Sequence, residues 1–371
     1  MDAFAPKTKE EQEKEERTYQ PYTEIMSTLP KVRGFAPQHL YNHQGFWYTE
    51  SNLPRVMAVQ NHFIAHSSDL LLATNPKCGT TWLKSLIFAI CNRKLHPSTQ
   101  HPLLTVNSHQ LVPFLELLYT NNQNPDLDIL PSPRLLATHI PYSSLPQSVL
   151  DSGCPLVYMC RNPKDAFVSW WHFLNKISNK ELTPSTLEEA FEMFCNGASI
   201  VGPFWDHVLD YWRASLDRPQ CVMFLKYEEM QAETIVHVKR LAKFVRCPFS
   251  LEEEKEGVVD EIIRLCSYEN LSRLDVNKTG EAMFGENEIK FHTFFRKEIQ
   301  ENEREEEQDQ ELHHIRRTPI DHTDANLPSK YHPTSLLPSN NGKPSCQKRL
   351  ESDETNAGDR TVSWLILLIN R

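Results

Sequence analysis

The segment with the clearest chemical signal runs from Thr74 to Trp82 and reads Thr-Asn-Pro-Lys-Cys-Gly-Thr-Thr-Trp. An apolar run precedes it and a helical pattern follows it, so it is predicted to be a loop between a buried strand and a helix. The unpaired N–H groups and the dipole of such a helix favour an anion. Gly79 lets the backbone curve around the anion, and Lys77 adds positive charge. Hydroxyl donors come from Thr80 and Thr81.

Two other interpretations of this loop stay open at this stage. The segment differs from the common P-loop, G-x-x-x-x-G-K-[ST], because Lys77 precedes Gly79. It could be an ordinary strand-to-helix turn in which a threonine caps the helix. A nucleotide kinase is a weaker hypothesis, because a kinase needs a lysine after the glycine and a carboxylate for a metal ion.

Three further apolar runs, at 134–138, 156–160 and 221–225, also end near polar side chains. Ligands in open α/β sheets bind outside the carboxyl ends of the strands. The four strand ends would then gather one lysine, one histidine, one arginine and one tyrosine at a single edge, namely Lys77, His139, Arg161 and Tyr227. This set of side chains indicates a site that binds an anionic ligand with an aromatic group and that transfers a proton. Taken singly, each residue could instead be structural: a hydrogen-bonded histidine, a surface ion-pair partner or a core aromatic.

The elements that must position these residues alternate along the chain. Apolar strands separated by helical patterns predict an α/β fold, with a central parallel sheet and helices on both faces. Helices are expected at 80–93, 164–176 and 204–216, and another should open with a capping box from Ser185 to Glu188.

Composition narrows the class of protein. The net charge of −10 argues against a nucleic-acid-binding protein, whose footprint should be basic. Nine cysteines without a C-x-x-C pair indicate free thiols in a reducing compartment, and neither a disulfide framework nor a metal site is expected. The N-terminus has no secretory signal, and the apolar run 364–369 is too short to span a bilayer. We therefore expect a cytoplasmic protein without a membrane partner.

The chain divides into three parts by composition. Residues 1–34 are predicted to be a mobile charged arm, and residues 35–298 a folded domain. After Lys297 the sequence becomes acidic and then rich in Pro, Ser, Asn and Asp, so residues 299–371 are predicted to be a disordered acidic and polar tail.

Several motifs in this domain resemble those of cytosolic sulfotransferases, and their amino-acid sequences are most similar to the plant branch. The similarity runs from about residue 35 to 297 and keeps the family's motif order. The motifs are Gln44-Gly-Phe-Trp-Tyr48, Pro76-Lys-Cys-Gly-Thr-Thr-Trp82, Ala137-Thr-His-Ile-Pro141, Arg161-Asn-Pro-Lys-Asp-Ala-Phe-Val-Ser169, Lys226-Tyr-Glu-Glu-Met230, Cys266-Ser-Tyr-Glu-Asn-Leu271, Val276-Asn-Lys-Thr-Gly280 and Phe294-Phe-Arg-Lys297.

The resemblance implies a P-loop-like sulfotransferase fold, with 3′-phosphoadenosine 5′-phosphosulfate (PAPS) as co-substrate and no metal. It implies that His139 is the general base and that Lys77 stabilises charge on the departing oxygen. The implied cofactor-binding residues are Lys77, Cys78, Gly79, Thr80, Thr81, Trp82, Arg161, Ser169, Tyr227, Cys266, Tyr268, Arg296 and Lys297. Within this set, Arg161, Ser169, Arg296 and Lys297 would hold the 3′-phosphate, and Trp82, Tyr227 and Tyr268 the adenine.

The predicted activity is transfer of the sulfuryl group to a hydroxyl of a small molecule. In the plant branch such acceptors include flavonoids, steroids and jasmonates. Candidate pocket residues are Trp47, Tyr142 and Phe173, because aromatic rings stack on flat acceptors. The protein is expected to be a monomer or a weak homodimer.

The sequence departs from the family after Lys297. The family continues with Gly-x-x-Gly-Asp-Trp-Lys-Asn, a loop that closes over the 3′-phosphate, followed by a helix. Here Glu298-Ile-Gln-Glu301 follows instead. This departure supports an alternative hypothesis, a catalytically impaired or non-catalytic relative that binds adenosine phosphates or an acceptor without turnover.

Overall fold

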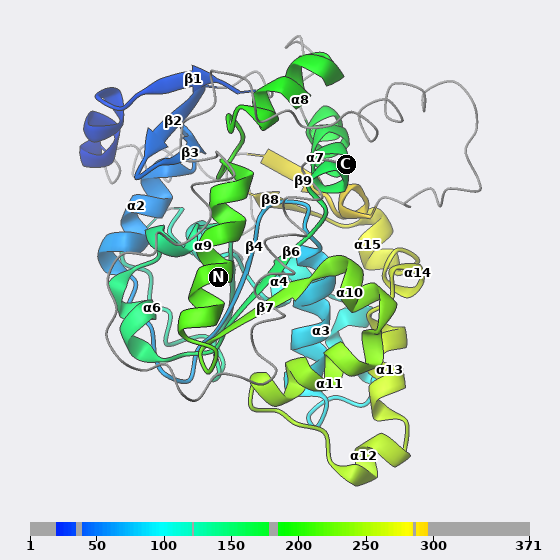
Figure 1. Ribbon diagram of the computed structural model, residues 1–371. Coiled ribbons are helices and arrows are strands. Elements are labelled where there is room, and N and C mark those ends of the chain that lie inside the picture. The colour runs from blue at the N-terminus through cyan, green and yellow to red at the C-terminus, as the bar shows by residue number, and fades with distance from the viewer. Residues whose placement is uncertain (1–19, 35–38, 121, 178–184, 285–286, 296–371) are drawn as a thin grey trace, which may run out of the picture. The chain divides into compact units, whose positions relative to one another are not determined.

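The computed structural model describes residues 20–34, 39–120, 122–177, 185–284 and 287–295. At its centre lies a four-stranded parallel sheet in the order β5-β4-β6-β7 (Figure 1). Strand β4 is the first of these four in sequence, yet it lies inside the sheet, between β5 and β6. The strands are β4 (Leu70–Thr74), β5 (Leu135–Thr138), β6 (Leu156–Cys160) and β7 (Val222–Lys226).

Helices cover both faces of this sheet (Figure 1). Leu72 and Val157 belong to an apolar cluster with residues of α3 (Thr80–Asn92), α11 (Thr234–Phe244) and α13 (Val258–Leu265). Tyr158, the next residue of β6, stacks on Tyr211 of α9 (Phe204–Asp217), with ring centroids 4.1 Å apart. Successive strand residues face opposite sides, so two apolar layers follow, and the predicted α/β class is confirmed.

The expected helices form within one or two residues of their predicted bounds, including α7 at Pro163–Ile177. The predicted capping box at Ser185 and Glu188 is wrong by one residue. Helix α8 (Leu187–Cys195) is capped by Thr186 and Glu189, which exchange hydrogen bonds with each other's backbone. Two Ser/Thr-x-x-Glu patterns overlap here, and Ser185 is buried, so the threonine takes the capping position.

The structure also contains an antiparallel sheet that the sequence analysis did not anticipate. It is formed by β1 (Lys31–Arg33), β2 (His39–His43) and β3 (Phe46–Thr49). Gln44 and Gly45 join β2 to β3, and both have positive φ angles (55° and 89°), as in the two-residue turn that suits a tight hairpin.

Part of the predicted N-terminal arm is folded. Residues 20–27 are helical, Tyr22 and Met26 are buried, and β1 pairs with β2. The prediction of a mobile arm to residue 34 is therefore wrong for 20–34, because two apolar side chains there find partners in the domain. Residues 1–19, and the predicted tail 299–371, lie outside the described residues.

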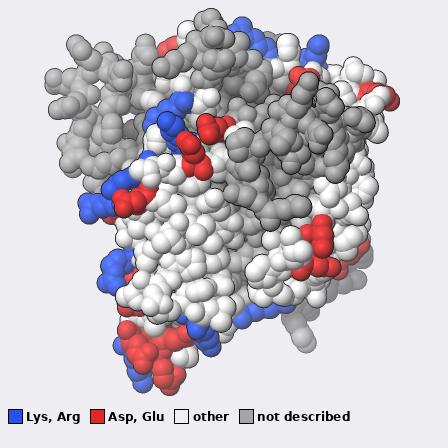
Figure 2. Space-filling model, turned by 180° about the vertical axis from the view of Figure 1, so that it is seen from behind, with Lys and Arg blue, Asp and Glu red and all other residues white. Residues whose placement is uncertain are grey.

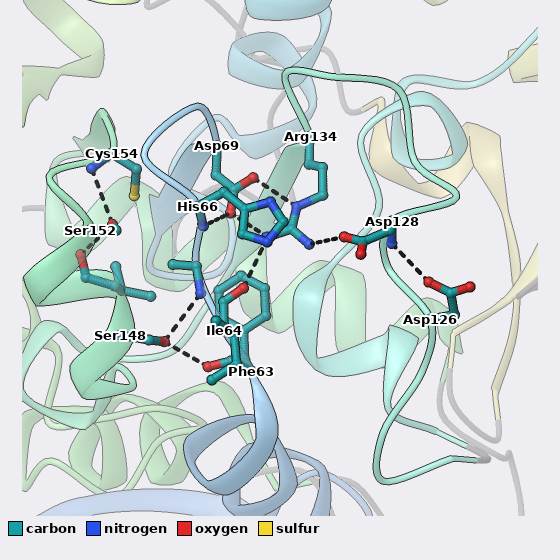
Figure 3. A network of polar contacts seen from close by, with 12 residues as sticks. Phe63, Ile64, His66, Asp69, Asp126, Asp128, Arg134, Ser148, Ser152 and Cys154 are labelled. Atoms are coloured by element: carbon teal, nitrogen blue, oxygen red, sulfur yellow. Dashed lines mark hydrogen bonds and ion pairs between the residues drawn. The ribbon is translucent and has the colours of Figure 1, made fainter.

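A buried ion pair joins the amino ends of β4 and β5 (Figure 3). Arg134 donates from Nε and Nη2 to the two carboxylate oxygens of Asp69, at 2.7 and 2.6 Å. Asp69 also accepts from the backbone N–H of His66, and Arg134 donates to the carbonyl of Ile64. Asp128 approaches the same guanidinium at 3.5 Å from the exposed side. The pair therefore anchors the strands at the edge opposite their carboxyl ends.

No helix in the described part of the chain is long and apolar enough to cross a membrane.

Seen from behind, charged side chains of both signs gather at the lower end of the domain, where α12 lies (Figure 2). The remaining elements are α2 (Leu53–His62), α4 (Ser108–Leu111), α5 (Leu115–Leu118), α6 (Gln147–Ser152), α10 (Tyr227–Ala232), α12 (Leu251–Lys255), α14 (Tyr268–Leu271), α15 (Asp275–Thr279), β8 (Glu281–Phe284), β9 (Asn287–Lys290) and short 3₁₀ turns at Ser98–Gln100, Pro102–Leu104, Tyr142–Ser144 and Phe291–Phe294.

Candidate active site

The loop between β4 and α3 has the backbone of an anion-binding turn. Lys77 and Gly79 both have positive φ angles, 65° and 91°. A Cβ atom on Gly79 would lie 2.6 Å from Met159 Cε and 2.8 Å from Tyr227 Cδ2, so only glycine fits there. Cys78 points inward and is fully buried, and burial raises the pKa of its thiol to about 12. The thiol is therefore neutral, and Cys78 can offer a ligand only its main chain.

The carboxyl ends of β4, β6 and β7 bring four predicted residues together. The guanidinium of Arg161 donates to the carbonyl oxygen of Lys77 at 3.3 Å. Its Cζ atom lies 4.7 Å from the centroid of the Tyr227 ring, which meets the Trp82 ring edge to face at 5.5 Å. A cation and two aromatic rings thus adjoin the loop, an arrangement that suits a phosphate linked to a planar base.

His139 is held in one tautomer at the end of β5. Its Nδ1 lies 2.7 Å from the carbonyl oxygen of Thr74, which can only accept, so Nδ1 carries the proton and Nε2 keeps its lone pair. Burial lowers the pKa of His139 to about 3, which leaves the ring neutral at pH 7. Its backbone N–H donates to Glu116 at 3.0 Å, and Thr138 donates to the same carboxylate at 2.9 Å. A neutral, oriented imidazole with a bare Nε2 can accept a proton.

The two threonines of the loop have different partners. The hydroxyl of Thr80 lies 2.7 Å from that of Thr74. The hydroxyl of Thr81 lies 3.0 Å from Nε2 of His109, whose Nδ1 lies 3.1 Å from the amino group of Lys84. Sequence reasoning missed His109, Lys84 and Glu116. One usable signal was Lys84 itself, a charged residue on the same face of α3 as Thr80.

The amino group of Lys77 lies 4.3 Å from the centroid of the Phe173 ring, on α7. Phe173 also stacks on Phe294 at 5.6 Å, a residue that the sequence analysis quoted in a motif without assigning it to the pocket. The structure therefore places Phe173, a predicted pocket residue, beside Lys77, a predicted catalytic residue.

The other two predicted pocket residues have different neighbours. Tyr142 packs edge to face on Tyr211 of α9, with ring centroids 5.6 Å apart. Trp47 lies in β3, where its backbone pairs with Val201 and Gly202.

Three other cofactor-binding candidates lie on α7, at the end of α13 and at the start of α14. Ser169 lies half-buried on α7, one turn before Phe173. The thiol of Cys266 is fully buried in the apolar cluster beneath α3, so only its main chain could reach a ligand. The Tyr268 ring adjoins Phe295 at 6.3 Å. Arg296 and Lys297 lie outside the described residues.

Fold and site together define a class: an α/β protein whose first parallel strand ends in a loop suited to an anion, beside a neutral histidine at the end of the next strand. No group of three or more His, Cys, Asp or Glu suited to a metal ion occurs within the described ranges. The sulfotransferase domain model matches residues 67–317, about two thirds of the chain. The chain belongs to the sulfotransferase family, whose members are transferases, and the resemblance seen in the sequence is confirmed.

Similar proteins come from plants. Cytosolic sulfotransferase 12 of Arabidopsis thaliana is 49% identical over 276 residues, 74% of this chain and 82% of the relative. Cytosolic sulfotransferase 5 of the same species is 48% identical over 278 residues, 74% and 85% of the two chains.

Solved structures show the same fold. The crystal structure of an Arabidopsis thaliana protein described as a candidate steroid sulphotransferase aligns with a TM-score of 0.59 and 47% identity, covering 67% of this chain and 85% of that one. A mouse sulfotransferase, crystallised with 3′-phosphoadenosine 5′-phosphate (PAP), aligns with a TM-score of 0.53 over 74% and 92% of the chains. At 21% identity this second likeness shows the fold alone.

Proposed function

We propose that this protein transfers the sulfuryl group of PAPS to a hydroxyl of a small flavonoid, steroid or jasmonate-type molecule in the cytoplasm. The observation that carries the proposal is the fixed tautomer of His139. Its Nδ1 proton is engaged by the Thr74 carbonyl at 2.7 Å, which leaves Nε2 as the acceptor for the proton of the hydroxyl. Thr74 is also the residue at which the phosphate loop begins, so the same residue orients the imidazole and starts the loop.

The residues present fit PAPS as co-substrate. The cradle at Gly79, which a Cβ would fill, gives the 5′ end of the ligand close access to the backbone, with Lys77 and the threonine hydroxyls around it. Arg161 offers a buried cation for a phosphate, while Trp82 and Tyr227 offer rings for adenine. When bound, PAPS supplies the sulfuryl group. His139 takes the acceptor's proton and Lys77 stabilises charge on the departing bridging oxygen.

Calorimetric binding of PAP to the full-length chain tests this function, since PAP reports the cofactor site without turnover. We expect a Kd in the micromolar range or tighter, followed by sulfation of at least one probe among a flavonol, a steroid alcohol and 2-naphthol. Binding of PAP without turnover of any probe would favour the non-catalytic alternative, which the changed sequence after Lys297 supports. Absence of PAP binding at millimolar concentration would overturn the proposal.

Gly79→Ala is expected to weaken PAP binding at least tenfold, because the new methyl group must displace the Tyr227 ring or Met159. Gly153→Ala is the matched control. Gly153 also has a positive φ angle, 64°, but nothing lies within 4 Å of the added Cβ. Both variants should lose about 1–2 kcal/mol of stability from backbone strain, and only Gly79→Ala should lose affinity. Equal PAP affinities for the two variants in calorimetry would contradict the close fit at Gly79.

A further inference from the structure

A buried basic pair lies beneath the phosphate loop and has no part in the function proposed so far. Lys84, on the second turn of α3, is fully buried, and His109, on α4, is 2% exposed. Lys84 Nζ lies 3.1 Å from His109 Nδ1, and His109 Nε2 lies 3.0 Å from the hydroxyl of Thr81. Three polar groups thus form one chain that begins in the core and ends at a residue of the loop.

Aromatic rings enclose this chain and fix its geometry. The His109 ring lies between Phe114 and Phe294, with ring centroids 5.5 and 4.3 Å away. The amino group of Lys84 lies 3.3 Å from the centroid of Phe114, a position that favours a positive charge. The His109 imidazole therefore has little freedom to turn away from Thr81.

Burial and neighbouring charged groups shift the pKa values of both members of the pair. Burial lowers the pKa of Lys84 well below its ordinary value, and the nearby carboxylate of Glu116 raises it. Burial also lowers the pKa of His109, and Lys84, Lys77 and His139 add to this effect, so the imidazole is neutral. A neutral imidazole has one N–H group, which either Nδ1 or Nε2 can carry.

The position of the Lys84 amino group over the Phe114 ring and the nearby carboxylate of Glu116 favour its ammonium form, and this form sets the direction of the hydrogen bonds. An ammonium group can only donate, so Nδ1 of His109 accepts and Nε2 carries the proton. Nε2 then donates to the oxygen of Thr81, and the Thr81 proton must point elsewhere. Thr81 lies in the first turn of α3, where the unpaired N–H groups of the helix also converge.

We propose that Lys84 and His109 are positioning residues that aim the hydroxyl proton of Thr81 at the anionic group held in the loop. The inference rests on the PAPS-binding function proposed above and assigns a part to two residues that do not touch the ligand. Each donor in the chain polarises the next one, which strengthens the final hydrogen bond to the anion.

Lys84→Met keeps the length of the side chain and removes its charge. The buried carboxylate of Glu116 then loses a nearby cation, so the melting temperature should fall. The folded variant should also bind PAP about tenfold more weakly, because one charge-assisted hydrogen bond loses its alignment. Non-additivity with Thr81→Val separates positioning from a general loss of stability.

PAP binding to four variants of the full-length chain tests the relay by calorimetry. Lys84→Met and Thr81→Val should each weaken binding about tenfold, and the double variant should weaken it about tenfold as well, because both changes remove the same hydrogen bond. Ser85→Ala is the control. It removes a hydroxyl that donates to the Thr81 carbonyl on the neighbouring turn, and PAP affinity should not change.

A double variant about a hundredfold weaker than the wild type, or Lys84→Met with wild-type affinity, would overturn the relay while leaving PAPS binding in place. A wild-type chain that fails to bind PAP would overturn the proposed function and the relay with it. Nitrogen-15 NMR of the histidines in the unmodified protein adds a readout independent of variants. We expect the His109 proton on Nε2 and the His139 proton on Nδ1, and a His109 proton on Nδ1 would overturn the relay.

Discussion

His139→Asn is expected to lower kcat by about 10²- to 10⁴-fold, the usual contribution of a general base, and to leave the affinity for PAP unchanged. Asparagine is the informative replacement because its amide nitrogen stands where Nδ1 stands in histidine. The variant can keep the hydrogen bond to the Thr74 carbonyl, which is 2.7 Å long in the protein. It loses only Nε2, the atom that would accept the proton.

The pH dependence separates this base from an ordinary exposed histidine. Burial lowers the pKa of His139 to about 3, from an ordinary value near 6.5. The neutral, active form therefore persists below pH 6, and kcat/KM, which reports the free enzyme, should show no inflection near pH 6.5 from this residue. The pKa of His139 is lower in the folded protein than in the unfolded chain, so folding favours the neutral ring. The resulting contribution to the free energy of unfolding is fully present above pH 6.5. It is lost as the pH falls from 6.5 toward 3.

Steady-state kinetics with PAPS and whichever probe acceptor is turned over, together with PAP calorimetry, measure these effects. His139→Asn should also lose less stability than the wild type on acidification from pH 6.5 to 4. Retention of more than a tenth of the wild-type kcat in a folded variant would exclude His139 as the base. A wild-type inflection near pH 6.5 that disappears in His139→Asn would contradict the lowered pKa of the imidazole.

The loop and the sheet were predictable because their signals are local. Each strand of the parallel sheet is a short apolar run, and the residue that follows it is polar, so Lys77, His139 and Arg161 could be placed at one edge from the topology alone. The hairpin of β2 and β3 was missed because its turn, Gln44-Gly45, has no Asn-Gly or Asp-Gly pair.

The residues that hold the site residues in place were not predictable, because they depend on contacts between distant segments. His109 lies on a helix of four residues, too short for any periodicity, and it meets Lys84 from 25 positions away. Phe294 approaches Phe173 across more than a hundred residues. Tyr142 likewise meets Tyr211 of α9, a distant part of the chain.

Asp69→Asn is expected to destabilise the domain by about 3–5 kcal/mol, the usual cost of removing one partner of a buried ion pair. Asp69 is fully buried, and both of its oxygens accept from Arg134 (Figure 3). The isosteric amide fills the same space but leaves the guanidinium without a counter-charge in the core. The melting temperature should fall by roughly 10 °C in thermal denaturation followed by circular dichroism.

The matched control is Asp128→Asn, which makes the same chemical change on the exposed side of the same guanidinium, where the side chain is 78% accessible. Solvent screens that contact, so its melting temperature should stay close to that of the wild type. Because Asp69 lies at the amino ends of β4 and β5, and His139 at the opposite edge, folded Asp69→Asn at low temperature should bind PAP as the wild type does. Equal melting temperatures for Asp69→Asn and Asp128→Asn would show that the buried pair does not anchor the sheet. Loss of PAP affinity in folded Asp69→Asn would show that the two edges are coupled.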